Sequence, residues 1–100
     1  MVKLIALFRK PADLEAFNDH YYRVHAPLAQ KMPGLRRFEV SGITGAPIGE
    51  APYYLLAELY FDTQELMDSA MASPEGRASA KDLMSFAANL VTIFYAEVQE

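Results

Sequence analysis

Both histidines of this 100-residue protein lie in one short segment that also carries two adjacent tyrosines. Between Asn18 and Pro27 the segment contains His20, Tyr21, Tyr22 and His25. An imidazole changes its protonation near pH 7, and a neighbouring phenol can donate a hydrogen bond to it or to a substrate oxygen. We therefore predict a catalytic site in which His25 transfers a proton together with Tyr21 or Tyr22.

The same segment has the spacing of an amphipathic helix. Its apolar positions follow in steps of three or four: Leu14, Phe17, Tyr21, Val24 and Leu28. Asp13 can cap this helix, and Met32-Pro33-Gly34 ends it near residue 31. At about 100° per residue, His25 lies beside the tyrosines on the flank of Asn18, whereas His20 falls on the opposite flank.

Two other roles for His25 stay open. Pro27 removes a backbone donor from the helix, so His25 could bind a backbone carbonyl there and hold the kink in place. A metal site with two histidines usually has a helical spacing of four, and the spacing of five between His20 and His25 turns the rings apart. We therefore predict no metal site.

Glu58 is the one carboxylate within an apolar strand predicted at residues 53–61. Three residues share its side of the strand: Tyr54, Leu56 and Tyr60. A buried carboxyl often has a raised pKa and can act as an acid or a base. Alternatively, Glu58 forms a salt bridge to Arg36 or Arg37 across a dimer interface.

Composition excludes several classes of function. The chain has no cysteine and a formal net charge of -4, so it offers no disulfide, no thiolate metal site and no basic patch for nucleic acid. No stretch reaches the roughly 20 apolar residues of a membrane span, and Met1–Phe8 is too short for a signal peptide. Glycine-rich phosphate or dinucleotide motifs are missing. We expect a cytoplasmic protein without a cofactor.

Apolar alternation and turn residues divide the chain into four strands and two helical regions. The predicted strands cover residues 3–9, 35–44, 53–61 and 90–98; a loop covers 42–52, and helices cover 13–31, 64–72 and, after Ser73-Pro74, the segment to 88. The order is βαββαβ, which is the ferredoxin-like arrangement of the α+β class, an antiparallel four-stranded sheet with its helices on one face. One domain accounts for residues 1–100.

The first, third and fourth predicted strands are apolar on both sides. A sheet with helices on one face alone should instead show polar residues on the other face. We therefore expect a second copy to cover that face, which makes the protein a homodimer in the form of a dimeric α+β barrel.

These residues together resemble the EthD family. Members share a first-helix pattern of a phenylalanine, an aromatic residue, a histidine and a proline, which here are Phe17, Tyr21, His25 and Pro27. The likeness continues through Leu28, Pro33–Arg37, Ala57–Asp62 and Ser73–Glu75, and so covers nearly the whole chain. One departure is Tyr54, where many members have an aspartate.

The resemblance implies a dimeric α+β barrel that acts on a small, apolar or aromatic, oxygen-bearing molecule. The family takes its name from a role in bacterial ether degradation, and members have been labelled reductases. Relatives of the same barrel type act as cyclases, dehydratases, isomerases or cofactor-independent oxygenases, with a histidine and tyrosines beside an apolar pocket. We expect substrate contacts from Phe17, Asn18, Leu28, Tyr54 and Glu58. The alternative is a non-catalytic dimer that binds a small ligand or serves as an accessory protein.

Overall fold

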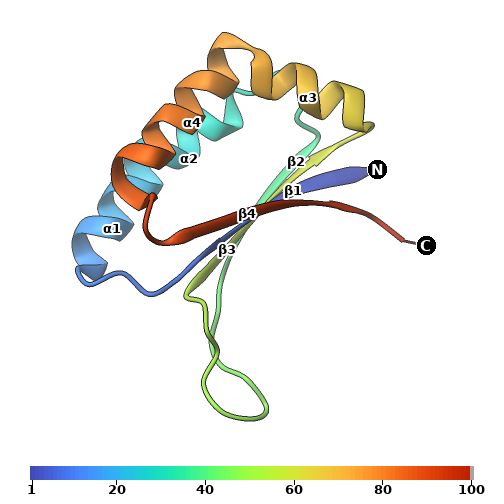
Figure 1. The fold of residues 1–100 in the computed structure, drawn as a ribbon. Helices are drawn as coiled ribbons and strands as arrows, with labels where there is room; N and C mark the ends of the chain where they lie inside the picture. Colours follow the sequence, from blue (N-terminus) through green and yellow to red (C-terminus); the bar gives the residue numbers. More distant parts are fainter. Residues whose placement is uncertain (100) are drawn as a thin grey trace.

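A computed structural model describes residues 1–99 and shows a sheet of four strands with helices packed on one of its faces (Figure 1). The elements are β1 (Val2–Phe8), α1 (Leu14–His20), the π-helical turn η1 (Tyr21–His25), α2 (Ala26–Gln30), β2 (Arg37–Gly42), β3 (Leu55–Phe61), α3 (Gln64–Ala72), α4 (Pro74–Ala87) and β4 (Val91–Glu97). The strand order is β2-β3-β1-β4, and every neighbouring pair is antiparallel. The predicted α+β, ferredoxin-like fold is confirmed.

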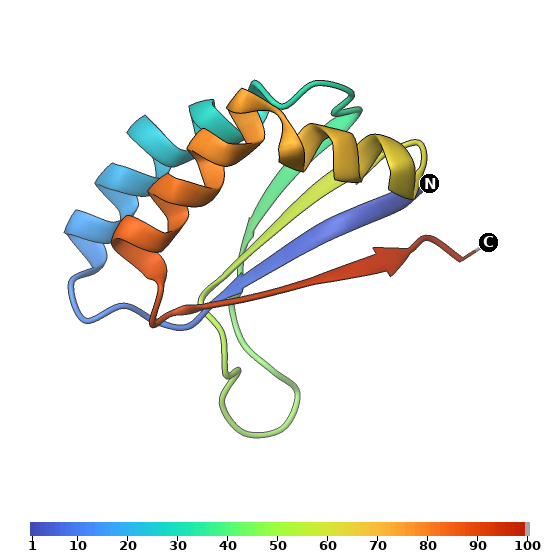
Figure 2. The same cartoon turned by 45° about the horizontal axis from the view of Figure 1, so that its top comes forward.

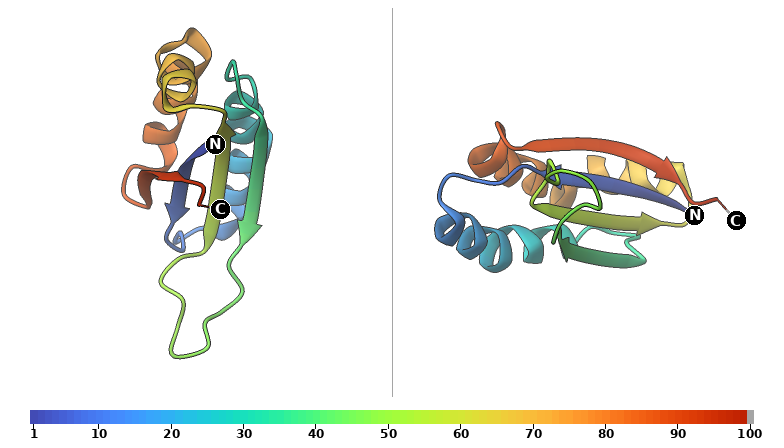
Figure 3. Two further views of the ribbon diagram at one scale, coloured as in Figure 1. Left: turned by 90° about the vertical axis from the view of Figure 1, so that its right-hand side faces the viewer. Right: turned by 90° about the horizontal axis from the view of Figure 1, so that it is seen from below.

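The helical layer consists of two rows that lie side by side over the sheet (Figure 2). The row α1–η1–α2 packs against α4, and α3 covers one end of β1 and β3. The view from below in Figure 3 places the whole layer on one side of the strands. No helix within residues 1–99 is long and apolar enough to cross a membrane.

Side-chain caps fix where the helices begin. The carboxylate of Asp13 accepts from the amide of Ala16, and the hydroxyl of Thr63 accepts from the amide of Leu66. Ser73 caps α4 in the same way, with Pro74 at its first turn. The starts at Asp13 and Ser73 agree with those predicted from the sequence.

The junction between α3 and α4 requires a glycine at position 76. A Cβ atom there would lie 2.1 Å from the carbonyl oxygen of Ala70 and 2.7 Å from the backbone of Met71. Gly76 therefore lets the two helices meet at a sharp angle, with Met71 held near the sheet.

The strands β1 and β3 alternate strictly between a buried and a half-buried residue. Their buried side chains face the helices and include Phe8 and Phe61, both with no exposed surface. On this side Ala6 pairs in register with Ala57. Two alanines therefore lie next to each other under the helices, where larger side chains would fill the space.

The other face of the sheet has no cover from residues 1–99 (Figure 3). Its central apolar side chains are Ile5 and Leu7 of β1, Leu56 of β3 and Phe94 of β4. Phe94 is 41 % exposed. Beyond the sheet, residues 43–54 form a long loop that extends away from the body of the protein (Figure 1). β2 ends two residues earlier than predicted, and β3 begins two residues later than predicted. This loop is therefore longer than expected.

Candidate functional site

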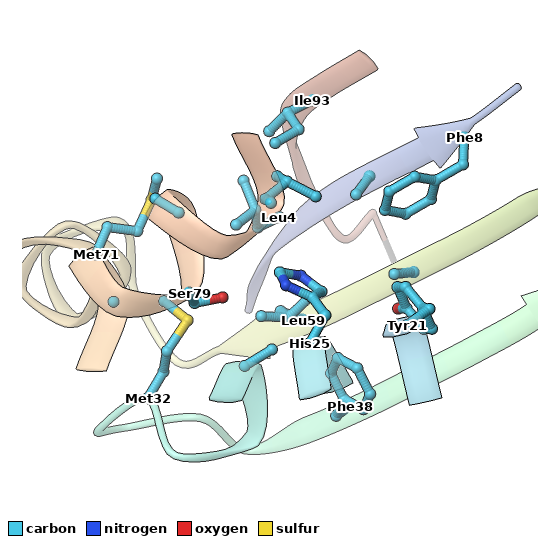
Figure 4. A pocket seen from close by; sticks show the side chains of 16 residues that line it. Leu4, Phe8, Tyr21, His25, Met32, Phe38, Leu59, Met71, Ser79 and Ile93 are labelled. Atoms are coloured by element: carbon cyan, nitrogen blue, oxygen red, sulfur yellow. The ribbon is translucent and has the colours of Figure 1, made fainter. Parts of the chain in front are cut away.

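A cavity of about 80 Å³ lies between the helical layer and the sheet (Figure 4). Most of its lining is apolar and includes Leu4, Phe8, Met32, Phe38, Leu59 and Met71. Three polar side chains reach it: Tyr21, His25 and Ser79. Ala6 and Ala57 form part of the lining on the sheet side, and their short side chains leave the space open.

His25 lines this cavity and is held from behind by a carboxylate of α4. Its Nδ1 lies 3.0 Å from Oδ2 of Asp82. Because a carboxylate accepts hydrogen bonds, Nδ1 carries the ring proton, and Nε2 of the neutral ring has a free lone pair. The side chains of His25 and Asp82 are only 9 % and 13 % exposed. The predicted alternative, a hydrogen bond from His25 to a backbone carbonyl, is therefore wrong.

Burial sets the charge of this pair. Desolvation lowers the pKa of His25 below its usual value of 6.5, against the smaller opposing influence of the Asp82 hydrogen bond and charge. His25 is therefore neutral at pH 7. A neutral imidazole with a free Nε2 can accept a proton, and Asp82 can then stabilise the imidazolium that forms.

His20 binds the second oxygen of the same carboxylate. Its Nε2 lies 2.8 Å from Oδ1 of Asp82, and its side chain is 34 % exposed at the surface. The prediction that His20 and His25 lie on opposite flanks is wrong, because η1 is a π-helical turn. Its i to i+5 bond, from the Ala26 amide to the Tyr21 carbonyl, brings residues five apart close to one side.

The same turn moves the buried stripe of the first helix by one residue. Before the turn, the predicted stripe positions Phe17 and Tyr21 are buried, whereas the first predicted position, Leu14, is 37 % exposed. After the turn, the buried residues are His25, Ala26 and Ala29. The predicted stripe positions Val24 and Leu28 are 42 % exposed and half-buried, respectively, so this part of the prediction is wrong. Leu28 does not line the cavity.

The two tyrosines of this turn lie in different surroundings. Tyr21 is 1 % exposed, and its ring centroid lies 5.6 Å from that of His25. Burial raises the pKa of Tyr21, so its phenol stays protonated and acts as a donor. Tyr22 is 52 % exposed and lies against the outer edge of Tyr21, away from the cavity. The structure therefore brings Tyr21, and not Tyr22, together with His25.

Three further predicted site residues support Tyr21 from behind. Phe17 stacks on Tyr21 with a centroid distance of 5.9 Å, and Tyr54 meets Phe17 edge-on. The Tyr54 hydroxyl donates to Oδ1 of Asn18 at 2.9 Å. None of the three lines the cavity.

Glu58 lies on the opposite face of the sheet from His25. Its Oε2 is 2.7 Å from Nζ of Lys3 in the same chain. The arginines expected to bind it pair elsewhere within the chain, Arg36 with Asp62 and Arg37 with Glu39. Glu58 thus takes no part in the cavity.

Asp82 and Ser79, both on α4, are the site residues that sequence reasoning missed. Ser79 lies within the buried stripe of α4, and Asp82 adjoins it. The stripe contains Gly76, Ser79, Leu83 and Ala87. Polar side chains next to such a stripe are only a weak indication of a functional site. The indication becomes stronger once the structure places them beside the two histidines. Within residues 1–99 no cluster of His, Cys, Asp or Glu has a metal-binding arrangement.

Comparison with known proteins adds a family to this geometry. The family model described as the EthD domain matches residues 9–89. A protein of Rhodococcus erythropolis, described as an uncharacterized 11.0 kDa protein in the thcB-thcC intergenic region, is 34 % identical over 97 residues, which cover 97 % of this chain and 94 % of that protein.

Solved structures show the same fold. An EthD family protein of Bacillus halodurans C-125 is 48 % identical, with a TM-score of 0.95 and 99 % coverage of both chains. A dimeric ferredoxin-like protein of unknown function from Thermobifida fusca YX is 16 % identical, with a TM-score of 0.72 over 97 % of this chain and 90 % of that chain. The family model and the two closely matching relatives together establish that the chain belongs to the EthD family.

Proposed function

We propose that this protein catalyses proton transfer on a small, apolar, oxygen-bearing molecule bound in the cavity between helices and sheet. His25 is the general base, Asp82 orients it, and Tyr21 donates a hydrogen bond to the substrate. The observation that carries the proposal is the contact of 3.0 Å between His25 Nδ1 and Asp82 Oδ2 beside an apolar cavity. Reactions of the isomerase, dehydratase, cyclase or cofactor-independent oxidoreductase type can begin with such a step.

The proposed step uses both nitrogens of His25. Nε2 accepts the proton that leaves the substrate, while Nδ1–H continues to donate to Asp82. The carboxylate then faces an imidazolium, and this charge pair is strengthened by the low polarity of the site. His20 binds the other carboxylate oxygen and so limits the rotation of Asp82. The proposal gives no substrate contact to the other residues predicted for the site: Tyr22, Phe17, Asn18, Leu28, Tyr54 and Glu58.

The size of the cavity limits the substrate. A volume of about 80 Å³ is near half of the roughly 150 Å³ apolar cavity that binds benzene in an engineered protein. The substrate must therefore be slender, or the lining must move. Met32 and Met71 suit the second case, since unbranched thioether side chains adapt to different shapes.

The assembly that we propose is a homodimer formed through the open face of the sheet. Ile5, Leu7, Leu56 and Phe94 form an apolar patch there, and a second copy would remove it from water. The cytoplasm remains the proposed location, because a chain without cysteine suits a reducing compartment. Light scattering should give twice the monomer mass of 11.2 kDa. Leu56→Glu should lower this mass toward that of the monomer. A wild-type protein that is already monomeric at micromolar concentration, with the same mass as Leu56→Glu, would contradict the dimer.

Hydrogen–deuterium exchange into small ketones and phenols in D₂O tests the catalytic proposal. We expect the wild-type protein to accelerate exchange of at least one of these compounds above the buffer rate, and His25→Gln to abolish the acceleration. Binding of the compounds without any accelerated exchange would instead show a non-catalytic ligand-binding protein.

A further inference from the structure

Ser79 carries a hydroxyl that faces the cavity (Figure 4). The residue is 8 % exposed and lies in α4 among cavity-lining residues. A serine within a helix commonly donates to a backbone carbonyl three or four residues earlier, as Ser85 does to Asp82 at 2.6 Å. The side-chain hydrogen bonds beside the cavity join both histidines to Asp82, and within residues 1–99 no such bond involves the Ser79 hydroxyl.

The position of Ser79 relates it to the proposed base. In Figure 4, Ser79 extends from α4 into the cavity toward the side where His25 enters, and Tyr21 lies beyond His25. Asp82 follows Ser79 by one helical turn. The helix α4 therefore supplies the carboxylate that holds His25 and a hydroxyl that points into the same apolar space.

A hydroxyl in an apolar cavity is unfavourable unless it finds a hydrogen-bond partner. Ser79 and Tyr21 both have O–H groups to donate, and His25 at neutral pH has a lone pair to offer. A complementary ligand thus has an oxygen that accepts hydrogen bonds and a separate hydrogen acidic enough to leave. No lysine or arginine is among the cavity-lining side chains of residues 1–99, so an anionic ligand would lack a counter-charge.

We propose that Ser79 binds the carbonyl oxygen of a small, uncharged, enolisable ketone or aldehyde, an assignment that rests on the function proposed for His25. Nε2 of His25 takes a proton from the carbon next to the carbonyl. The electron pair of the broken C–H bond forms the C=C bond of an enolate, and the C=O π pair moves to the oxygen. Ser79 and Tyr21 donate hydrogen bonds to that oxygen, and return of the proton to carbon restores His25.

The chemistry of this step needs no redox partner. The proton taken up by His25 can return to the same carbon, which gives exchange, or to another carbon of a conjugated enolate, which gives an isomer. Donors aimed at a developing oxyanion contribute strongly to such reactions, because they are oriented before the charge appears. Ser79 is therefore a catalytic residue in this scheme and contacts the reacting oxygen.

Acetone is a slender ketone that suits the small cavity, and exchange of its α-hydrogens in D₂O can be followed by proton NMR. We expect Ser79→Ala to lower the protein-catalysed exchange rate by about 10²-fold, the usual loss for one oxyanion donor. Ser85→Ala is the matched control, since it removes a hydroxyl from the same helix outside the cavity, and it should leave the rate unchanged. Thermal melts of both variants should resemble that of the wild type.

The outcomes separate the two proposals. Full exchange by Ser79→Ala with none by His25→Gln would overturn the role of Ser79 and leave the function of His25 intact. Exchange of phenol-class compounds alone, with no binding or exchange of acetone, would overturn the carbonyl assignment. Failure of the wild-type protein to accelerate exchange of any probe would overturn both proposals.

Discussion

Asp82 and His25 are 57 residues apart in the chain, yet Oδ2 of the carboxylate lies 3.0 Å from Nδ1 of the ring. The contact crosses from α4 to the π-helical turn η1, and the other oxygen of Asp82 holds His20 at 2.8 Å. This arrangement fixes which nitrogen of His25 carries the proton. Nε2, the nitrogen that we propose to accept the proton, makes no bond to this carboxylate.

Replacing Asp82 with Asn tests this orientation. The amide keeps the shape of the side chain, but only one of its two end atoms is an oxygen that accepts hydrogen bonds. It therefore cannot accept a hydrogen bond from both histidines in the way that the two carboxylate oxygens do. We expect a loss of about 10²–10⁴-fold in catalysed exchange, as for other histidines that lose an orienting carboxylate. Unfolding should become easier by about 1–3 kcal/mol. Asp68→Asn, on the exposed side of α3, is the control. Equal exchange by Asp82→Asn and the wild type would rule out an orienting role.

The two adjacent tyrosines form a matched pair of variants. Tyr21→Phe removes a hydroxyl from the cavity, whereas Tyr22→Phe removes one from the surface. We expect Tyr21→Phe to slow exchange at least about tenfold, since one hydrogen bond to a developing charge is lost. Tyr22→Phe should behave like the wild type. The reverse order of effects would return Tyr22 to the site and remove Tyr21.

The sequence predicts those parts of the fold and of the site that depend on residues close together in the chain. Strand alternation in β1 and β3 and the helix starts at Asp13 and Ser73 are local signals, and they predict the correct element order. The histidine segment was also found, because its density is visible in one window.

The π-helical turn is not a local signal. The apolar spacing up to Val24 and Leu28 fits a regular α-helix equally well, and one extra residue in the turn changes the outcome for everything that follows. Packing of His25 and Ala29 against the sheet, together with Pro27, which lacks an amide N–H, favours the wider turn. Sequence spacing therefore misplaced His20 and Leu28.

Asp82 and Ser79 could not be assigned for a different reason. Their roles come from packing of α4 beside η1, and no spacing rule connects residues 57 positions apart. Glu58 shows the converse case. A carboxylate within an apolar strand suggested a site, but strand alternation places it on the far face, where it pairs with Lys3.

Filling the cavity should stop binding without unfolding the protein. In Ala57→Leu, three added carbon atoms would enter the space next to Ala6. We expect acetone binding to be lost and the free energy of unfolding to change by about 1–3 kcal/mol, the usual range for an enlarged core side chain. Ala46→Leu adds the same atoms in the exposed loop and should bind normally. Undiminished binding by a folded Ala57→Leu protein would place the ligand elsewhere.

The pH dependence of stability should reveal the buried neutral His25. Because burial lowers its pKa in the folded state, the unfolded chain binds a proton more readily. The contribution of His25 is therefore fully present above pH 6.5 and is lost as the pH falls from 6.5 through the folded-state pKa. Urea unfolding at several pH values and one protein concentration should show this loss in the wild type and less of it in His25→Gln. Parallel curves for the two proteins would contradict the assignment.

The central claim is that His25 is a neutral base whose Nδ1–H is held by Asp82. Nitrogen NMR of the ¹⁵N-labelled imidazole ring, recorded from pH 5 to 8, measures its pKa and its tautomer together. The account predicts the Nδ1-protonated tautomer at pH 7, a pKa below 6.5, and a shift of the Nε2 resonance when acetone is added. A ring that is charged at pH 7, or that carries its proton on Nε2, would contradict it.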